Sequence, residues 1–184
     1  MPTAPKKTPA RKAAAATSHR SPADAIALLR ADHQQVSALF EQYEKARLAS
    51  KKKAIVGEIC SALRVHAQIE EELFYPAAKA TLKDHELVPE ALVEHASLKA
   101  LMAQIEGKDP NGEEFDAKVK VLSEYVKHHV KEEQNELFPK VRASRLDIRD
   151  LGARLALRKA ELLGAGPQGQ MPHGEAPQAV EAET

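Results

Sequence analysis

Two stretches of the chain share the pattern that decides its fold. Residues 65–76 read VHAQIEEELFYP, and residues 128–139 read HHVKEEQNELFP. Each contains a histidine followed four residues later by a glutamate, and each ends in an aromatic residue and a proline. The two pairs are His66 with Glu70 and His129 with Glu133. Residues four apart lie above one another on one face of a helix, within reach of a shared ion. The stretches therefore predict two helices, each presenting a His-x-x-x-Glu pair.

The same stretches belong to an internal repeat. One further histidine precedes each pair, His33 in the first half and His95 in the second, 62 residues apart. The two His-x-x-x-Glu pairs are 63 residues apart, and behind them come the matching blocks Leu73-Phe74-Tyr75-Pro76 and Leu137-Phe138-Pro139. Chance spacing would not align both the histidines and the packing blocks. The repeat therefore predicts two copies of a helix pair around a pseudo-two-fold site.

Apolar residues at alternating steps of three and four predict four long helices. Their stripes cover residues 26–43, 55–73, 92–105 and 115–137, and each stripe contains one of the four histidines. The third stripe consists of Leu92, His95, Leu98, Met102 and Ile105. No window alternates with period two, so strands are not expected. The sequence predicts an all-α fold, an up-down-up-down antiparallel four-helix bundle with an additional short C-terminal helix.

Capping signals predict where several of these helices begin and end. Ser21 is the expected N-cap of the first helix, followed by Pro22 and with Asp24 as its third residue. The second and third helices are separated by a break near residues 84–89, and Gly107 closes the third. The fifth helix is expected to start at Ser144, with Asp147 at its third position, and to stop at Gly164.

Composition sets the domain organisation and excludes several protein classes. Residues 1–20 carry five basic residues and no acid, residues 165–184 carry three acids and no base, and both are expected to be disordered tails. Residues 21–143 form the predicted bundle and 144–164 the last helix. The single cysteine, Cys60, excludes a disulfide framework and a thiolate metal cage. With no secretory signal and no apolar run of about 18 residues, a cytoplasmic protein without membrane contact is expected.

Polar residues in the centre of the predicted bundle indicate a metal site. Buried polar clusters are paired or coordinate metals, and burying unpaired carboxylates is costly. Four imidazoles and two carboxylates without a thiolate suit iron, manganese or zinc, and carboxylates that can bridge favour two ions. If two six-coordinate ions share these carboxylates and a bridging oxide or hydroxide, about two positions stay open for a small ligand.

These residues resemble the hemerythrin family, in its hemerythrin-like or HHE cation-binding branch, over roughly residues 23–143. The resemblance implies a non-haem centre of two oxo- or hydroxo-bridged iron ions that binds or senses dioxygen or related species. The metal ligands that it implies are His33, His66, Glu70, His95, His129 and Glu133.

Two positions depart from the oxygen-carrying hemerythrins. Those proteins have a second histidine where this chain has Lys99, and their last carboxylate is an aspartate five residues after the fourth-helix histidine, whereas Glu133 lies four after His129. One of the two ions then has fewer protein ligands, which disfavours simple oxygen transport. Two functions stay open. The first is a module that binds or senses dioxygen, nitric oxide or iron, and the alternative is an enzyme that detoxifies peroxide or nitric oxide or oxidises ferrous iron.

Other residues near these motifs have competing interpretations. His128 with Glu132 is a rival pair on the fourth helix, and His129 is preferred because it continues the apolar stripe. Tyr75 either packs in the core or approaches the site. Three glutamates either face solvent or orient imidazole N–H groups: Glu71, Glu72 and Glu94. A third functional hypothesis is weak, non-specific contact of residues 1–20 with nucleic acid. The oligomeric state stays open.

Overall fold

The computed structural model describes residues 24–83, 86–110 and 112–164. These residues form helices joined by short connections, with no strand among them. The elements are α1 (Ala25–Lys45), α2 (Ala49–Ile69), η1 (Glu70–Phe74), α3 (Tyr75–Leu82), α4 (Leu87–Ile105), α5 (Gly112–Glu132), η2 (Glu133–Leu137), α6 (Phe138–Ala143) and α7 (Ile148–Leu162). The prediction of an all-α protein is confirmed. The predicted tails, residues 1–20 and 165–184, lie outside the described residues.

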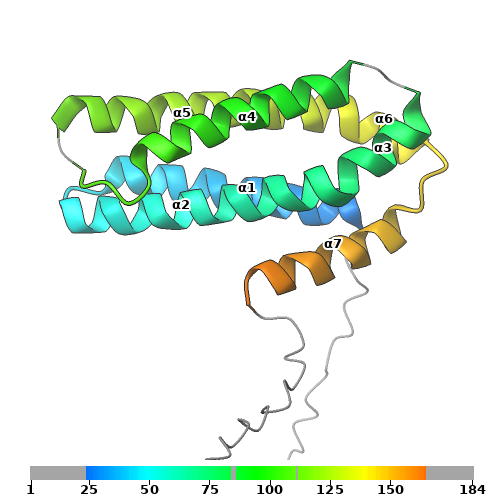
Figure 1. Cartoon of the computed structure of the whole chain (residues 1–184), viewed down its shortest axis with the longest axis horizontal. Helices are drawn as coiled ribbons and strands as arrows, with labels where there is room; N and C mark the ends of the chain where they lie inside the picture. Colours follow the sequence, from blue (N-terminus) through cyan, green and yellow to red (C-terminus); the bar gives the residue numbers. More distant parts are fainter. Residues whose placement is uncertain (1–23, 84–85, 111, 165–184) are drawn as a thin grey trace, which may run out of the picture.

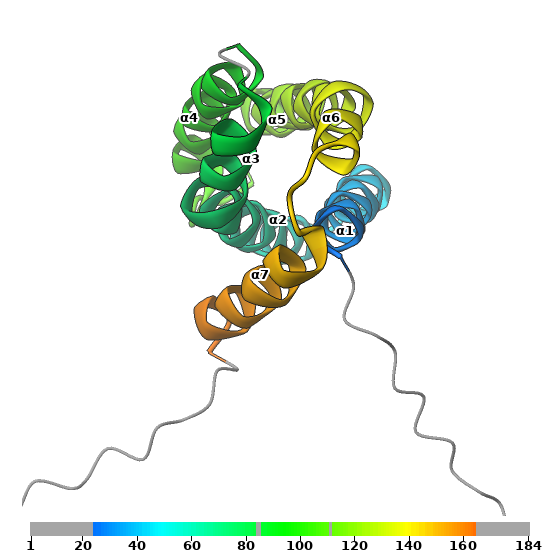
Figure 2. The ribbon, with the colours of Figure 1, turned by 90° about the vertical axis from the view of Figure 1, so that its right-hand side faces the viewer.

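The long helices lie side by side (Figure 1). Helix α1 packs against α2 and α5, and α4 packs against α5 and α2, so each long helix has two long neighbours. Helices α3 and α6 continue α2 and α5 beyond the π-helical turns η1 and η2. Seen from the end in Figure 2, these elements surround a common interior, and α7 crosses the outside over α1 and α2. None of the described helices is both long and apolar enough to cross a membrane.

Two apolar clusters fill the interior, and the four histidines separate them. On α1, His33 lies between Leu29 of one cluster and Val36 of the other, and on α2, His66 lies between Leu63 and Ile69. The histidines of α4 and α5 divide the clusters in the same way. A polar layer therefore crosses the middle of an otherwise apolar core.

Two helix starts differ from the sequence prediction. Asp24, expected inside the first helix, is its N-cap: its backbone is extended, and its carboxylate accepts a hydrogen bond from the N–H of Ala27 at 2.8 Å. Asp147 likewise caps α7 by accepting from the N–H groups of residues 149 and 150, while Ser144 ends α6. In both cases the short carboxylate reaches the free N–H groups of the first turn. The predicted cap Ser21 and first residue Pro22 lie outside the described residues.

The predicted apolar stripe of the third helix was wrong at one position. Leu92 is 42% exposed, whereas Val88 and Ala91 are buried. Helix α4 begins at Leu87 with Pro89 in its first turn, where the missing N–H of proline costs no hydrogen bond. The face that packs against the bundle therefore continues from His95 through residues 91 and 88.

Each His-x-x-x-Glu segment ends in a π-helical turn that periodicity did not predict. The N–H of Tyr75 donates to the carbonyl of Glu70, and the N–H of Phe138 donates to that of Glu133, each five residues back. A proline follows each aromatic residue, and it cannot donate the next helical hydrogen bond. Such turns occur frequently at functional sites.

Candidate metal centre

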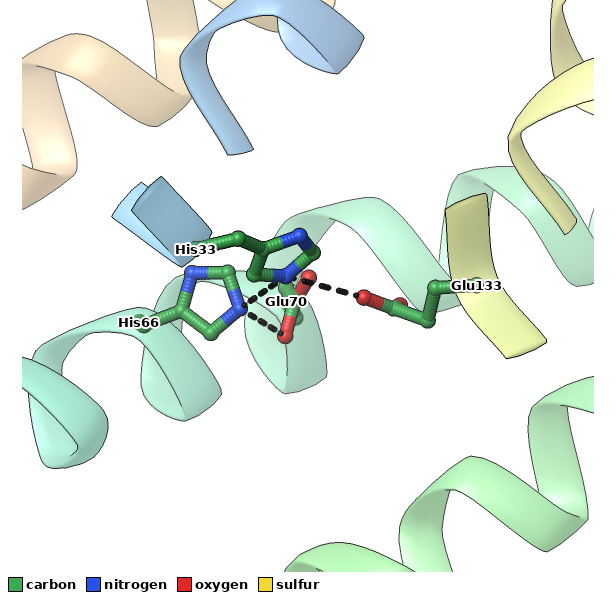
Figure 3. A group of neighbouring side chains, drawn as sticks. All are labelled: His33, His66, Glu70 and Glu133. Atoms are coloured by element: carbon green, nitrogen blue, oxygen red, sulfur yellow. Dashed lines mark hydrogen bonds and ion pairs between the residues drawn. The ribbon is translucent and has the colours of Figure 1, made fainter. Parts of the chain in front are cut away.

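Six polar residues from four long helices meet in the interior layer, and each is at most 5% exposed. They are His33 from α1, His66 from α2, Glu70 at the start of η1, His95 from α4, His129 from α5 and Glu133 at the start of η2. Figure 3 shows four of them, with His33, His66, Glu70 and Glu133 pointing toward one another. The structure thus brings together all six residues implied by the resemblance.

The four imidazoles form two pairs. The Nε2 atoms of His33 and His66 are 3.0 Å apart, and those of His95 and His129 are 3.1 Å apart. The first pair comes from α1 and α2, the second from α4 and α5. Each half of the sequence repeat therefore supplies one pair.

The two glutamates connect the imidazole pairs. Glu70 Oε2 lies 3.1 Å from His66 Nε2 and 3.5 Å from His95 Nε2. Glu133 Oε2 lies 3.3 Å from His33 Nε2 and 3.6 Å from His129 Nε2. Each carboxylate thus contacts one imidazole of each pair, the arrangement expected of a carboxylate between two ions.

The outer ring nitrogens face a second layer of polar side chains. His95 Nδ1 and Glu71 Oε1 are 2.9 Å apart, and His129 Nδ1 and Glu94 Oε2 are 2.7 Å apart. The side-chain amide of Gln134 contacts His33 Nδ1 at 3.1 Å, and Asp32 Oδ2 faces His66 Nδ1 at 3.6 Å. Such partners fix the ring orientation of metal-binding histidines.

This donor set fits metal ions. When His95 and His129 are both neutral and their Nδ1–H groups donate outward, both Nε2 atoms present lone pairs toward each other across 3.1 Å. Glu70 Oε1 has no hydrogen-bond partner, and Glu133 Oε2 contacts only the imidazoles of His33 and His129, at 3.3 and 3.6 Å. Converging lone pairs and buried, unpartnered carboxylate oxygens are costly without a cation. The ligand atoms fall into two overlapping groups: His33, His66, Glu70 and Glu133, and Glu70, His95 and His129.

Electrostatic interactions in the metal-free centre favour different protonation states for the two glutamates. Burial, together with the charge of Glu133, raises the pKa of Glu70 well above its usual value. Burial also acts to raise the pKa of Glu133, but the hydrogen bond with His33 and the nearby imidazoles outweigh it and lower that pKa to about 2. Burial and the charge of His129 lower the pKa of His95 to about 4. A cation between the carboxylates would favour ionisation of both.

Tyr75 also reaches the centre. Its hydroxyl donates to Glu133 Oε1 at 3.0 Å and lies 3.3 Å from His95 Nε2 and 3.5 Å from Glu70 Oε2. The side chain is fully buried, and burial raises its pKa well above the usual value. Tyr75 therefore both packs in the core and approaches the site, so the two interpretations from the sequence are compatible.

The rival register on α5 faces outward. His128 is largely exposed and pairs with Glu132 at 3.1 Å, while His129 and Glu133 lie inside. Of the three second-layer candidates, Glu71 and Glu94 contact imidazoles, but Glu72 pairs with Arg158 of α7. Lys99, at the position of the absent histidine, pairs with Glu71 at 2.7 Å. Three further histidines, His19, His85 and His173, lie outside the described residues.

Sequence reasoning missed Asp32 and Gln134, although the repeat contained a signal for both. Asp32 precedes His33 as Glu94 precedes His95, and Gln134 follows Glu133 as Glu71 follows Glu70. In the structure, Asp32 and Glu94 each face the second histidine of their own half. Glu71 and Gln134 each contact the first histidine of the other half. The pseudo-two-fold relation therefore extends to the second layer.

Comparison with known proteins agrees with this geometry. Residues 24–141 match the family described as the hemerythrin HHE cation binding domain. Over 115 residues the chain is 30% identical to a protein named DNA nickase from Nostoc sp. (strain PCC 7120), covering 62% of this chain but only 32% of that relative.

A similar fold occurs in the crystal structure of a hemerythrin HHE cation binding domain-containing protein from Mycobacterium kansasii. The TM-score is 0.68 at 20% identity, over 78% of this chain and 89% of that one. At that identity the likeness concerns the fold alone, whereas the family match spans most of the bundle and all six interior polar residues. The chain belongs to the hemerythrin HHE cation-binding domain family.

Proposed function

We propose that this chain binds two iron ions within its antiparallel four-helix bundle and uses them to bind or sense dioxygen, nitric oxide or iron. The observation that carries the proposal is the pairing of imidazoles around two shared carboxylates. His33 and His66 would hold one ion, His95 and His129 the other, and the two glutamates would bridge them. Manganese and zinc suit the same donors.

The protein side chains would hold and insulate the ions. The second-layer contacts of Glu71, Glu94 and Gln134 fix the rings with Nε2 pointing inward. The apolar clusters on both sides exclude bulk water from the layer. When bound, iron supplies the redox chemistry and the affinity for small oxidants that these side chains lack.

A small cavity beside the imidazoles supports a diatomic ligand. Its volume is about 20 Å³, enough for one water-sized molecule. Besides all four histidines it is lined by Lys99 and by apolar side chains: Val36, Leu63, Ala67, Leu98, Met102, Val126 and Val130. Dioxygen, nitric oxide and peroxide, with two heavy atoms each, come nearest to this size among the candidate ligands, whereas larger substrates do not fit.

A second candidate function is an enzyme that turns over peroxide or nitric oxide or oxidises ferrous iron. The buried hydroxyl of Tyr75 favours it, because its hydrogen bond to Glu133 holds a proton at the centre. Association with DNA is a third candidate. It rests on the five basic residues of 1–20 and on the name of the Nostoc relative, of which the chain spans about a third.

Metal content and the visible spectrum test the proposal. Protein grown in iron-replete medium is expected to hold about two irons per chain and to show an oxo-bridge charge-transfer band. His66→Ala, which removes an interior imidazole, should lose both features, while His128→Ala on the outer face should retain two tightly bound ions. Folded protein that refuses iron would overturn the proposal. Steady turnover of peroxide that is lost in His66→Ala would favour the enzyme. Stable ligand binding without turnover would favour the sensing module.

A further inference from the structure

A second group of metal-ligating side chains lies on the outer face of α4 and α5. His128 Nε2 is 3.5 Å from Glu94 Oε1 and 3.1 Å from Glu132 Oε1, and one ligand atom from each residue lies within 4.8 Å of the others. His128 is 64% exposed and the two glutamates are partly exposed. Unlike the interior layer, this group is open to solvent.

Glu94 links the outer group to the interior centre. Its Oε1 faces His128, while its Oε2 accepts a hydrogen bond from His129 Nδ1 at 2.7 Å. The adjacent histidines of α5 thus contact opposite oxygens of one carboxylate, one histidine from outside and the other from inside.

A small cavity lies between the outer group and the interior centre. It is lined by Glu94 and Glu132 of the outer group and by His129 and Glu133 of the centre, together with Leu87, Glu90, Ala91 and Leu137. Its volume is about 10 Å³, close to the minimum that one water needs. Glu133 is only 2% exposed, and its Oε2 faces the imidazoles of His33 and His129 at 3.3 and 3.6 Å. The cavity therefore borders the interior centre as well as the outer group.

Among the residues that the structure describes, the opposite side of the bundle has no such group. The repeat places Val65 and Ile69 where the second half has His128 and Glu132. There Asp32, the counterpart of Glu94, contacts Lys159 of α7, which lies across α1 and α2 (Figure 2). The two halves are alike at the centre but differ on the outside, so within the part of the chain that the structure describes this outer group occurs on the α4–α5 side and not on the α1–α2 side.

We propose that Glu94, His128 and Glu132 form a second, solvent-facing site for a divalent transition-metal ion, and that ions enter the interior centre through it. One imidazole and two carboxylates suit Fe²⁺, Mn²⁺ or Zn²⁺. With three protein ligands and water in the remaining positions, the outer site binds more weakly than the interior centre. The outer site stands on its own geometry, whereas the entry role rests on the proposed function.

Equilibrium binding of Mn²⁺ to the metal-free full-length protein tests the outer site, with free Mn²⁺ counted by its magnetic resonance signal. Wild-type protein is expected to show two tight equivalents and a weaker third. His128→Ala and Glu132→Gln should each weaken the third equivalent by about ten-fold or more while the two tight ones stay unchanged. The matched control is Glu113→Gln, an exposed glutamate of α5 that lies about 22 Å along the helix from His128 and about 28 Å from Glu132.

The outcomes separate the two proposals. A third equivalent that His128→Ala leaves unchanged, or that wild-type protein lacks, means that the outer residues form ion pairs only, and the outer site is refuted. If wild-type protein does not bind two tight equivalents of Mn²⁺, the interior centre is refuted instead.

Iron loading tests the entry role. Fe²⁺ is added anaerobically in an amount too small to fill all sites of the protein, and the sample is then exposed to air. The visible charge-transfer band should develop several-fold more slowly in His128→Ala than in wild type, and the final iron content of the two proteins should be the same. A variant that has lost the third equivalent but loads at the wild-type rate refutes entry through this site.

Discussion

Replacing Asp32 by asparagine is expected to weaken metal binding although Asp32 is not a ligand. Its side chain is 9% exposed, and its carboxylate faces His66 Nδ1 across 3.6 Å and contacts the ammonium of Lys159 on α7. Asparagine keeps the size and removes the charge. His66 would then lose the group that favours its outward N–H, so the inward Nε2 becomes a poorer donor.

The magnitude follows from burial. Removing one partner of a fully buried ion pair costs about 3–5 kcal/mol. The Lys159 side chain is 26% exposed and can regain water, which reduces the expected loss to about 1–2 kcal/mol. In a chain of this size that lowers the melting temperature by roughly 2–8 °C. Loss of an outer partner of a metal ligand typically lowers metal affinity by about 10- to 100-fold.

The assay is competition with a chelator for Zn²⁺ or Fe²⁺, together with thermal unfolding of the metal-free protein. Lys159→Met serves as a partner variant, because it breaks the ion pair but leaves the carboxylate facing His66. It should lower stability to a similar degree and metal affinity less. Glu161→Gln, which breaks an exposed pair on the same helix, should change neither. Asp32→Asn protein that binds metal as tightly as wild type would refute the reasoning.

Three further predictions concern the interior layer. Because the pKa of folded His95 is about 4 and that of the unfolded residue is near 6.5, the unfolded metal-free chain takes up a proton that the folded chain excludes. This contribution therefore lowers the free energy of unfolding as pH falls from 6.5 to 4, by up to about 1.4 kcal/mol per pH unit. In urea titrations at a series of pH values, the free energy of unfolding of His95→Gln should fall less steeply with decreasing pH than that of wild type. Tyr75→Phe removes the donor to Glu133 and should cost the metal-free protein about 1–3 kcal/mol in the same titration; no change would mean that the hydroxyl is replaced by water. Phe138 lies parallel to the ring of His33 at 5.9 Å, so Phe138→Leu should lower stability by about 1–3 kcal/mol and broaden the histidine's resonance in NMR spectra, and an unperturbed resonance would contradict a role in holding the ring.

The core and the centre could be predicted because their signals are local. Helical spacing puts one histidine into each apolar stripe, and the repeat aligns those histidines with the glutamates four residues later. The second layer was harder to predict, because Asp32 and Gln134 lie at the margin between the core and solvent, where periodicity treats them as surface residues. Their roles depend on contacts with neighbouring helices, which sequence spacing within one helix does not define.

Helix boundaries and the π turns lay beyond such reasoning for other reasons. Near both Asp24 and Asp147, a serine three residues earlier competes as a cap, and propensity alone does not separate the two. Proline after an aromatic residue is compatible with an ordinary kink as well as with a π turn. Only the hydrogen bonds to the carbonyls of Glu70 and Glu133 distinguish these possibilities.

The two π turns fix how many residues separate each glutamate from the aromatic ring that follows it. Each residue of an α-helix advances the chain by about 100° around the axis, so one residue more or less shifts the helical phase by that angle. A π turn absorbs an additional residue instead, because its hydrogen bond reaches five residues back rather than four. Deleting one residue between Glu70 and Tyr75 would therefore restore an ordinary α turn in which the N–H of Tyr75 still meets the carbonyl of Glu70, and α3 would keep its phase. The π turns therefore place one more residue between each glutamate and its ring than an α turn allows, without rotating the helix that follows. A single-residue deletion in these turns should disrupt the fold less than a single-residue deletion within α2 or α5.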